Sequence, residues 1–196
     1  MPMIDTQNIT DEELFLLVKK DNSNALKMLF KKYYENLCFF SYSFVKDRYA
    51  SQEVVSDIFI ILWEKRKRII ITGKIKSYLY AAVKNQSLNY IRKNRIHFES
   101  IDEVDRLLLT VQDNSDDIVN YEELQKIIDG VIDKLPEKRK LIFQMNKFDE
   151  LSYEEIANIL TISVSTVRNQ MIKAVKFLNN QYPALKKIIS LLILSL

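Results

Sequence analysis

Residues 152–178 read SYEEIANILTISVSTVRNQMIKAVKFL, and this stretch decides the fold expected for the second half of the chain. Ser152 and Glu155 have the spacing of a capping box, which begins a short helix. A tight turn at residues 161–162 follows, and Ser163 can cap a longer helix. A short capped helix, a turn of about three residues and a longer helix are the layout of a helix-turn-helix.

The two helices predicted over residues 152–160 and 163–179 each have an inner and a polar face. The apolar side chains expected inside are Ile156, Ala157, Leu160, Val164, Val167, Met171, Val175 and Leu178. The polar face of the longer helix can enter a major groove, where Arg and Asn make bidentate base contacts and Lys suits phosphates. The residues expected to bind DNA are Ser163, Ser165, Thr166, Arg168, Asn169, Lys173 and Lys176. An ordinary antiparallel helix pair is the alternative for this pattern alone.

Glycine and proline are scarce in the whole chain, which has 2 Gly and 3 Pro among 196 residues. Hairpins and phosphate-cradling loops need glycine for positive φ, so β-rich folds and Gly-loop nucleotide folds are nearly excluded. The hydrophobic content of 47% is ample for a buried core. We therefore expect an all-α protein of two small helical domains joined by an acidic linker, the second domain containing the helix-turn-helix.

Cysteine and histidine occur once each, as Cys38 and His97. A single cysteine cannot form an intramolecular disulfide, and no Cys/His set has metal-ligand spacing. The carboxylates show no recognisable catalytic spacing. We expect no enzyme activity, no cofactor, no metal and no small-molecule substrate. The N-terminus is polar and acidic, which argues against a signal peptide and favours a cytoplasmic location.

Charge is strongly segregated beneath the formal net charge of +3. Residues 1–97 carry +7, residues 98–134 carry −8 and residues 135–196 carry +4. Two basic blocks around an acidic one suggest two polyanion-facing modules and a distinct connector. Solvated helix faces with a chance asymmetry are the alternative. The expected boundaries are a first domain over 1–97, an acidic linker over 98–117, a second domain over 118–182 and an apolar tail over 183–196.

Helical periodicity and capping signals give the expected elements of both domains. Thr10 and Glu13 have the spacing of another capping box. The remaining helices are predicted over residues 24–46, 51–68, 77–95, 118–134 and 136–147, with Pro136 as the first helical residue and a loop over 66–76.

Four stretches, in this order, resemble sigma-70-class transcription initiation factors. Glu53-Val54-Val55-Ser56-Asp57-Ile58-Phe59 with Leu62-Trp63-Glu64 resembles their core-polymerase-binding helix. Lys76-Ser77-Tyr78-Leu79-Tyr80-Ala81-Ala82-Val83-Lys84-Asn85, continued by Asn89-Tyr90-Ile91-Arg92-Lys93, resembles their promoter −10 helix. Leu135-Pro136-Glu137-Lys138-Arg139 and the helix-turn-helix resemble their −35-binding domain. The small size and the missing middle domain resemble the extracytoplasmic-function (ECF) group.

This resemblance implies an alternative sigma factor that binds core RNA polymerase and directs promoter recognition and transcription initiation. The implied partners are core RNA polymerase, promoter DNA (duplex at −35, melted at −10) and a membrane-associated anti-sigma factor. Two rival interpretations remain. One is a stand-alone helix-turn-helix regulator that binds duplex DNA without polymerase, and the other is a helical adaptor whose basic faces bind an acidic protein.

The resemblance also implies a polymerase-binding set on the helix over residues 51–68. Its members are Glu53, Asp57, Phe59, Trp63 and Glu64. The carboxylates can pair with basic residues on the polymerase clamp helices, and large aromatic side chains dominate interface energies. We expect at least one of the two aromatic residues to lie in the core instead, and of the two we expect Trp63. Ser56 departs from the Gln usual at its position in the family.

Basic and aromatic residues form the expected −10 surface, because melted promoter DNA needs an electrostatic groove and a pocket for extruded bases. The set is Arg66, Lys67, Arg68, Lys74, Lys76, Tyr78, Lys84, Asn85, Arg92 and Lys93. By resemblance, the loop over 66–76 captures a −10 base and Asn85 contacts DNA beside it. Tyr80 is expected to be an ordinary core or boundary residue.

Two segments have alternative interpretations. By resemblance, the linker over 98–117 threads through polymerase toward the RNA exit path, and a plain tether fits its composition nearly as well. The apolar tail over 183–196 is too short to span a bilayer. We expect it to pack on the helix-turn-helix domain rather than on a regulator.

Overall fold

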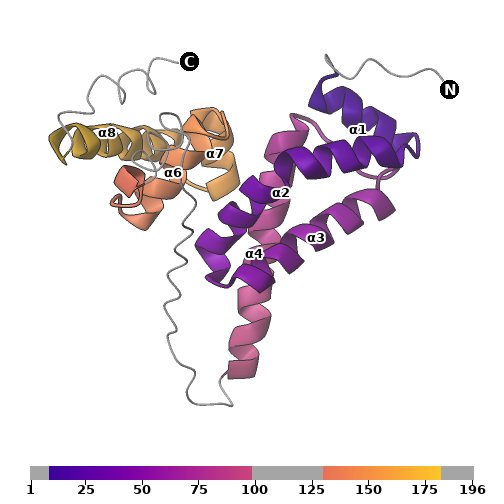
Figure 1. Cartoon of the computed structure of the whole chain (residues 1–196), viewed down its shortest axis with the longest axis horizontal. Helices are drawn as coiled ribbons and strands as arrows, with labels where there is room; N and C mark the ends of the chain where they lie inside the picture. Colours follow the sequence, from indigo (N-terminus) through magenta and orange to yellow (C-terminus); the bar gives the residue numbers. More distant parts are fainter. Residues whose placement is uncertain (1–8, 99–129, 182–196) are drawn as a thin grey trace, which may run out of the picture. The chain divides into compact units, whose positions relative to one another are not determined.

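The computed structural model describes residues 9–98 and 130–181, and the side chains of all of these except 95–98. Within these ranges every regular element is a helix, so the all-α expectation is confirmed. The described residues form two compact units: the first comprises residues 9–94 with Ala157–Ile162, and the second comprises the other described residues (Figure 1). The expected linker, the apolar tail and most of the helix predicted over 118–134 lie outside the described residues.

Seven helices are described with their bounds. In the first part of the chain they are α1 (Asp11–Lys19), α2 (Ser23–Val45), α3 (Arg48–Glu64) and α4 (Ile75–Phe98). In the second part they are α6 (Glu137–Lys147), α7 (Tyr153–Leu160) and α8 (Val164–Gln181).

Side-chain caps fix where the first three helices begin. At α1, the Thr10 hydroxyl accepts a hydrogen bond from the Glu13 amide at 3.2 Å, and the Glu13 carboxylate accepts one from the Thr10 amide at 2.8 Å, so this capping box is confirmed. The bond from the Thr10 backbone lowers the pKa of the Glu13 carboxyl. The side chain of Asn22 caps α2 in a similar way, through the Ala25 amide.

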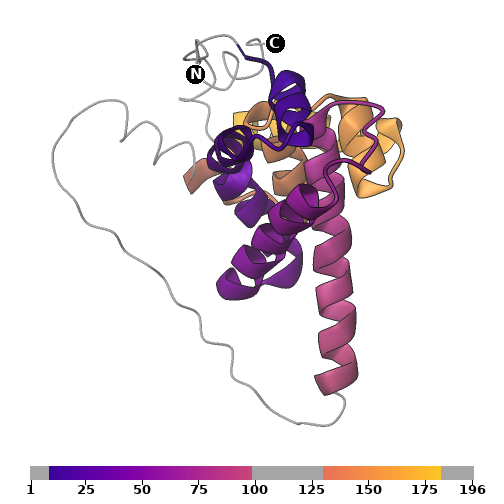
Figure 2. The same cartoon turned by 90° about the vertical axis from the view of Figure 1, so that its right-hand side faces the viewer.

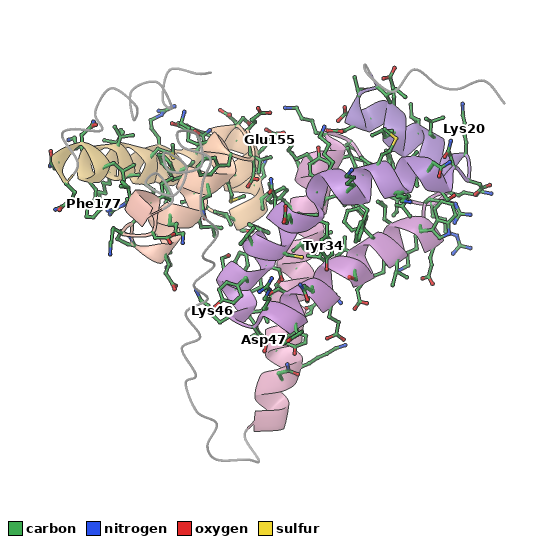
Figure 3. All side chains as sticks on the ribbon, in the orientation of Figure 1. Lys20, Tyr34, Lys46, Asp47, Glu155 and Phe177 are labelled. Atoms are coloured by element: carbon green, nitrogen blue, oxygen red, sulfur yellow. The ribbon has the colours of Figure 1, made fainter. Side chains whose placement is uncertain are left out.

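Helix α3 begins three residues earlier and ends four residues earlier than the predicted span of 51–68. Its early start follows from Asp47, whose carboxylate accepts a hydrogen bond from the Ala50 amide at 2.7 Å. Lys46 adopts the left-handed conformation, with φ of 59°, and ends α2 immediately before this cap. Figure 3 shows Lys46 and Asp47 together at the turn between the two helices.

The core of the first unit lies between α2, α3 and α4. Its largest fully buried members include Leu29 and Leu37 of α2, Leu62 of α3 and Leu79 of α4. Each such side chain contributes about 1.5–3 kcal/mol of apolar transfer free energy. Tyr80 of α4 is buried as expected.

Helix α4 meets α2 through one aromatic and one polar contact. The rings of Phe40 and Tyr80 lie edge to face, 4.9 Å apart. The hydroxyls of Ser41 and Ser87 are fully buried and hydrogen-bond to each other at 2.9 Å, which satisfies both. Ser87 takes the inward position, and its neighbour Leu88 is exposed. The second half of α4 continues past α2 and α3 (Figures 1 and 2).

The second unit has its own apolar core, in which α6 packs against α8. Phe143 and Met145 of α6 and Val167 and Leu178 of α8 are buried there. Pro136 is the N-cap of α6 rather than its first helical residue, because its ψ of 139° is extended. The helix therefore begins at Glu137, one residue later than predicted, and ends at Lys147, as predicted.

Candidate DNA- and polymerase-binding surfaces

Helices α7 and α8 have the local geometry of a helix-turn-helix. Ser152 and Glu155 form the predicted capping box, with distances of 3.2 Å from the Glu155 amide to the Ser152 hydroxyl and 2.9 Å from the Ser152 amide to the Glu155 carboxylate. Glu155 is labelled in Figure 3. The Ile162 amide closes the turn by donating to the Ala157 carbonyl at 3.0 Å. The Ser163 hydroxyl then accepts from the Thr166 amide at 3.1 Å and caps α8, as expected.

The turn residue Thr161 has a φ of 59°. The left-handed region costs about 1–2 kcal/mol for an ordinary residue, and a β-branched side chain is uncommon there. The sequence offers neither the Gly nor the Asn that would relieve this cost. Thr161 is therefore a strained point between the two helices.

The polar face of α8 is exposed as predicted. The exposed members are Ser165, Thr166, Arg168, Asn169, Lys173 and Lys176. Ser163 is exposed as well, but its hydroxyl is occupied by capping and lies 2.7 Å from that of Thr166. Buried residues of the inner face are Val167, Met171 and Leu178, as expected, whereas Val164 and Val175 are only half-buried.

One apolar residue on this face was missed by the sequence reasoning. Ile172 is 47% exposed and lies one turn after Arg168 and one turn before Lys176. The sequence does contain a signal for this placement, because residues 168, 172 and 176 are spaced by four and therefore share one face of the helix. Ala174, in contrast, is buried and completes the inner face.

The acidic residues predicted on α3 share one face of that helix. Glu53 and Glu64 are exposed and Asp57 is half-buried. Their spacings of four and seven residues place them on the same side. Ile60 lies among them, 55% exposed, and was not predicted. This face is therefore an exposed isoleucine surrounded by carboxylates.

The two aromatic residues of α3 do not have the expected burial. At least one of them is in the core, as predicted, but it is Phe59 and not Trp63. Phe59 is only 4% exposed and its ring meets that of Phe30 edge to face at 5.0 Å, so it is not an available anchor. Trp63 lies at the edge of the buried face, half-buried, with the Arg66 guanidinium 4.1 Å from its ring centroid.

Ser56 also lies at the edge of the acidic face of α3. Its hydroxyl donates to the Gln52 carbonyl at 2.8 Å, within the helix. The hydroxyl of Ser56 thus bonds to the backbone of its own helix. Because the family usually has Gln at this position, the surface of α3 here presents one polar group fewer than is usual.

The connection between α3 and α4 contains the first four predicted −10 residues. Lys67, Arg68 and Lys74 are exposed, whereas Arg66 is half-buried. Arg66 and Lys67 both form ion pairs with Asp21, from the turn between α1 and α2. The sequence reasoning missed Asp21, since 45 residues separate it from Arg66.

The −10 residues predicted on α4 fall on two faces. Tyr78, Asn85 and Arg92 are spaced by seven residues and so lie on one side of the helix. Lys76 and Lys84 lie on a neighbouring side, half-buried, and Lys93 is exposed next to Arg92. Burial raises the pKa of the Tyr78 hydroxyl. The structure thus groups an aromatic ring, an amide and a guanidinium in one row.

Two descriptions of known families match the chain where these surfaces lie. The family "Sigma-70 region 2" matches residues 29–96, and "Sigma-70, region 4" matches residues 125–178. Together they cover more than half of the chain. The chain belongs to the sigma-70 family. It is an alternative sigma factor, and it directs promoter recognition.

Curated relatives support this assignment across nearly the whole length. The ECF RNA polymerase sigma-E factor of Escherichia coli (strain K12) is 24% identical over 184 residues, which are 90% of this chain and 96% of the relative. The RNA polymerase sigma-H factor of Pseudomonas aeruginosa is 24% identical over 172 residues, which are 84% of this chain and 89% of the relative. The sigma factor therefore matches proteins of similar extent.

Two solved structures share its fold. CnrH, solved in complex with the cytosolic domain of CnrY, matches with a TM-score of 0.55 and 16% identity, over 89% of this chain and 97% of that one. The sigma factor RpoE of Bartonella quintana, solved with the anti-sigma factor NepR, matches with a TM-score of 0.57 and 16% identity, over 79% of this chain and 94% of that one.

Across residues 9–98 and 130–181, no helix combines the length and the apolarity needed to cross a membrane. No group of three or more His, Cys, Asp or Glu side chains in the same ranges is arranged to hold a metal ion.

Proposed function

We propose that this sigma factor uses three surfaces at a promoter. The acidic face of α3 binds core RNA polymerase, the α3–α4 loop with the row on α4 binds the melted −10 element, and the exposed face of α8 binds the −35 duplex. The observation that carries the proposal is that every polar residue predicted on α8 is exposed, since base readout requires side chains that can reach into a groove.

At the −35 element, Arg168 and Asn169 are the residues suited to bases. Each good bidentate contact discriminates against a wrong base by about 1–3 kcal/mol. Lys173 and Lys176, further along α8, suit phosphates, which fix the register of the protein on the duplex. Ile172, between them, offers an apolar contact of the kind made with a thymine methyl group.

At the −10 element, the proposed surface must hold bases that have left the duplex. Stacking on an aromatic ring contributes about 1–3 kcal/mol per base, which is comparable with the few kcal/mol needed to flip one. Tyr78 provides a ring, Asn85 an amide for a base edge and Arg92 a charge for the backbone, in one row of α4. The exposed basic residues of the loop, Lys67, Arg68 and Lys74, attract the strand together with Lys76, Lys84 and Lys93.

At the polymerase, the proposed contact combines Glu53, Asp57 and Glu64 with Ile60. An apolar side chain surrounded by charges is the usual arrangement of an energetically important contact, since the rim excludes water from it. Ile60 replaces Phe59 in this role because Phe59 is buried in the core. Trp63, half-buried at the edge, adds the partly exposed edge of its ring.

We further infer that the protein works in the cytoplasm and is held inactive by an anti-sigma factor, one associated with the membrane. Two proteins of the same fold were solved as complexes, the sigma factor RpoE with the anti-sigma factor NepR and CnrH with the cytosolic domain of CnrY. Co-expression with a candidate regulator domain tests this inference. Stable copurification supports it, and failure of every candidate encoded beside the gene contradicts it.

In vitro transcription with core polymerase tests the proposal as a whole. Initiation at specific start sites on genomic fragments should require this protein. The stand-alone regulator predicts specific duplex binding by the protein alone, and the acidic-protein adaptor predicts no DNA binding. If initiation never depends on the protein, the sigma-factor proposal is contradicted and the two rival functions are favoured. All affinities need a stated salt concentration, because phosphate contacts weaken steeply with ionic strength.

A further inference from the structure

The turn between α1 and α2 lies against the loop that joins α3 to α4. Lys20, labelled in Figure 3, is the C-cap residue directly after α1, and Asp21 follows it with a φ of 67°. The amides of Lys20 and Asp21 donate to the carbonyls of Leu17 and Val18, each at 3.0 Å, so the backbone of this turn is fixed. Asp21 therefore lies in a hydrogen-bonded turn rather than in an irregular loop.

Asp21 binds two consecutive basic residues of the loop. Its Oδ1 accepts hydrogen bonds from Arg66 Nε at 2.7 Å and Nη2 at 2.6 Å, and its Oδ2 lies 2.8 Å from Lys67 Nζ. These two cations lower the pKa of the Asp21 carboxyl. Both oxygens are therefore engaged, and the carboxylate is held in its charged form.

Arg66 connects this carboxylate to the end of α3. Its side chain is 20% exposed, its guanidinium covers the Trp63 ring at 4.1 Å, and it also donates a hydrogen bond to the Trp63 carbonyl. A guanidinium held at three points has little freedom to reach DNA. Its role in the loop is positional, unlike that expected from its charge alone.

A second contact from α1 holds the loop three residues later. Lys19 Nζ donates to the Ile69 carbonyl at 2.9 Å, in a partly buried position. The next residue, Ile70, is 83% exposed. Lys65 adds local order, since its carbonyl accepts from the Ile69 amide at 3.0 Å. The first half of the loop is thus anchored and Ile70 stands just beyond the last anchor.

We propose that Asp21, with Lys19, is a positioning device that sets the shape of the α3–α4 loop for capture of a −10 base. We call this set of contacts the α1 clasp: Asp21 with Arg66 and Lys67, and Lys19 with the Ile69 carbonyl. The proposal rests on the proposed function, in which this loop captures the base. It adds a residue outside the DNA-facing helices that determines base discrimination without contacting DNA.

The first arm of the test uses the purified full-length protein without polymerase. Trp63 is the only tryptophan of the chain, so its fluorescence reports on Arg66 directly. Asp21→Asn removes the charge but keeps the size of the side chain, and it should raise acrylamide quenching of Trp63. Glu12→Gln, on the exposed face of α1, is the matched control and should leave quenching unchanged. Equal quenching in wild-type and Asp21→Asn protein overturns the clasp.

The second arm uses reconstituted holoenzyme and a promoter library randomised across the −10 element. Asp21→Asn should reduce base discrimination at one −10 position by about three- to fivefold, the scale of an exposed ion pair. Preferences in the −35 element and affinity for core polymerase should stay as in wild type. Asp21→Glu, which keeps the carboxylate, should restore most of the discrimination.

The outcomes separate this inference from the proposed function. A uniform loss of transcription with unchanged base preferences, or equal defects in Asp21→Asn and Asp21→Glu, indicates a merely structural role and overturns the inference. Unchanged discrimination in Asp21→Asn also overturns it, while specific wild-type transcription leaves the proposed function intact. Absence of specific transcription by the wild-type protein overturns both, whatever Trp63 quenching shows about the clasp itself.

Discussion

The two units present their DNA-facing residues in different ways. The polar face of α8, in the second unit, is set by local backbone geometry: a cap at Ser163 and a left-handed residue, Thr161, just before it in the sequence. In the first unit, the α3–α4 loop and the face of α3 depend on contacts between residues far apart in sequence, such as Asp21 with Arg66 and Phe30 with Phe59. Local geometry can be read from a sequence pattern, whereas these long-range contacts cannot.

The largest expected effect comes from removing a long-range contact, that between Phe30 and Phe59. Phe59→Ala should lower the free energy of unfolding by about 3–5 kcal/mol, because it removes a buried ring from the α2–α3 contact. Ile60→Ala, at the next residue, should change stability by less than about 0.5 kcal/mol. Urea unfolding of both variants measures the difference.

Core-polymerase affinity should show the opposite order for folded variants of the same two residues. Ile60→Ala should weaken binding by more than about 1 kcal/mol. The conservative Phe59→Leu should leave it near wild type. A strong binding defect in Phe59→Leu together with a neutral Ile60→Ala would contradict the assignment of the α3 face.

The next largest effects concern the exposed polar face of α8, which is set by local backbone geometry. Arg168→Ala should weaken −35 recognition by about 1–3 kcal/mol and relax specificity at one base pair, leaving core affinity intact. Lys176→Ala should weaken binding about equally for all sequences and reduce the salt slope by about 1. Holoenzyme binding to −35 variants at several salt concentrations distinguishes the two. Loss of core affinity in Arg168→Ala would argue against the domain assignment.

One substitution that introduces a glycine and one that removes a glycine compare the turn between α7 and α8 with the loop between α3 and α4. Thr161→Gly should stabilise the protein by about 0.5–1 kcal/mol, since the left-handed cost of about 1–2 kcal/mol is partly offset by the greater freedom of unfolded glycine. Gly73→Ala should also stabilise, by about 0.4–1 kcal/mol, because Gly73 has no positive φ and open space around its Cβ position.

Thermal unfolding of these variants, with Thr161→Ala as the control, provides the measurement. Thr161→Ala keeps a side chain in the left-handed region and should show no comparable gain. Destabilisation by Thr161→Gly would mean that the turn is not strained.

The smallest expected effect is a pH dependence of the α1 clasp. Because the folded-state pKa of Asp21 lies below its ordinary value, its contribution is present above about pH 4 and is lost as the pH falls through the folded pKa. Trp63 quenching should therefore rise at acidic pH in the wild type. Asp21→Asn should lack this transition; an identical transition in both proteins would assign it to another group.

Much of the fold could be predicted because its signals are local. Capping boxes at Thr10 and Ser152 and the 3.6-residue period fixed the helices to within a few residues. The period also assigned the exposed face of α8 correctly. It failed for Phe59 and Trp63 because the burial of a residue at the edge of an apolar stripe depends on its neighbours in space. Here the Phe30 ring packs on Phe59, and the Arg66 guanidinium lies over Trp63.

The candidate site could be predicted only in part, for the same reason. Charge and spacing identified basic residues from Arg66 onward, but nothing near them in sequence indicated that Asp21 engages two of them. Ile60 and Ile172 were passed over because exposed apolar residues are ordinary on protein surfaces. They became meaningful once the structure placed each one among charged residues of a single face.

Permanganate and nuclease footprinting on one promoter tests the central claim most directly, that both units act together on DNA through core polymerase. With holoenzyme, we expect protection of the −35 duplex and permanganate-reactive thymines at −10, with −35 protection lost in Arg168→Ala. The protein alone should give neither at the same concentration. Equal protection of the duplex by the protein without core polymerase, and no melting with it, would contradict the account.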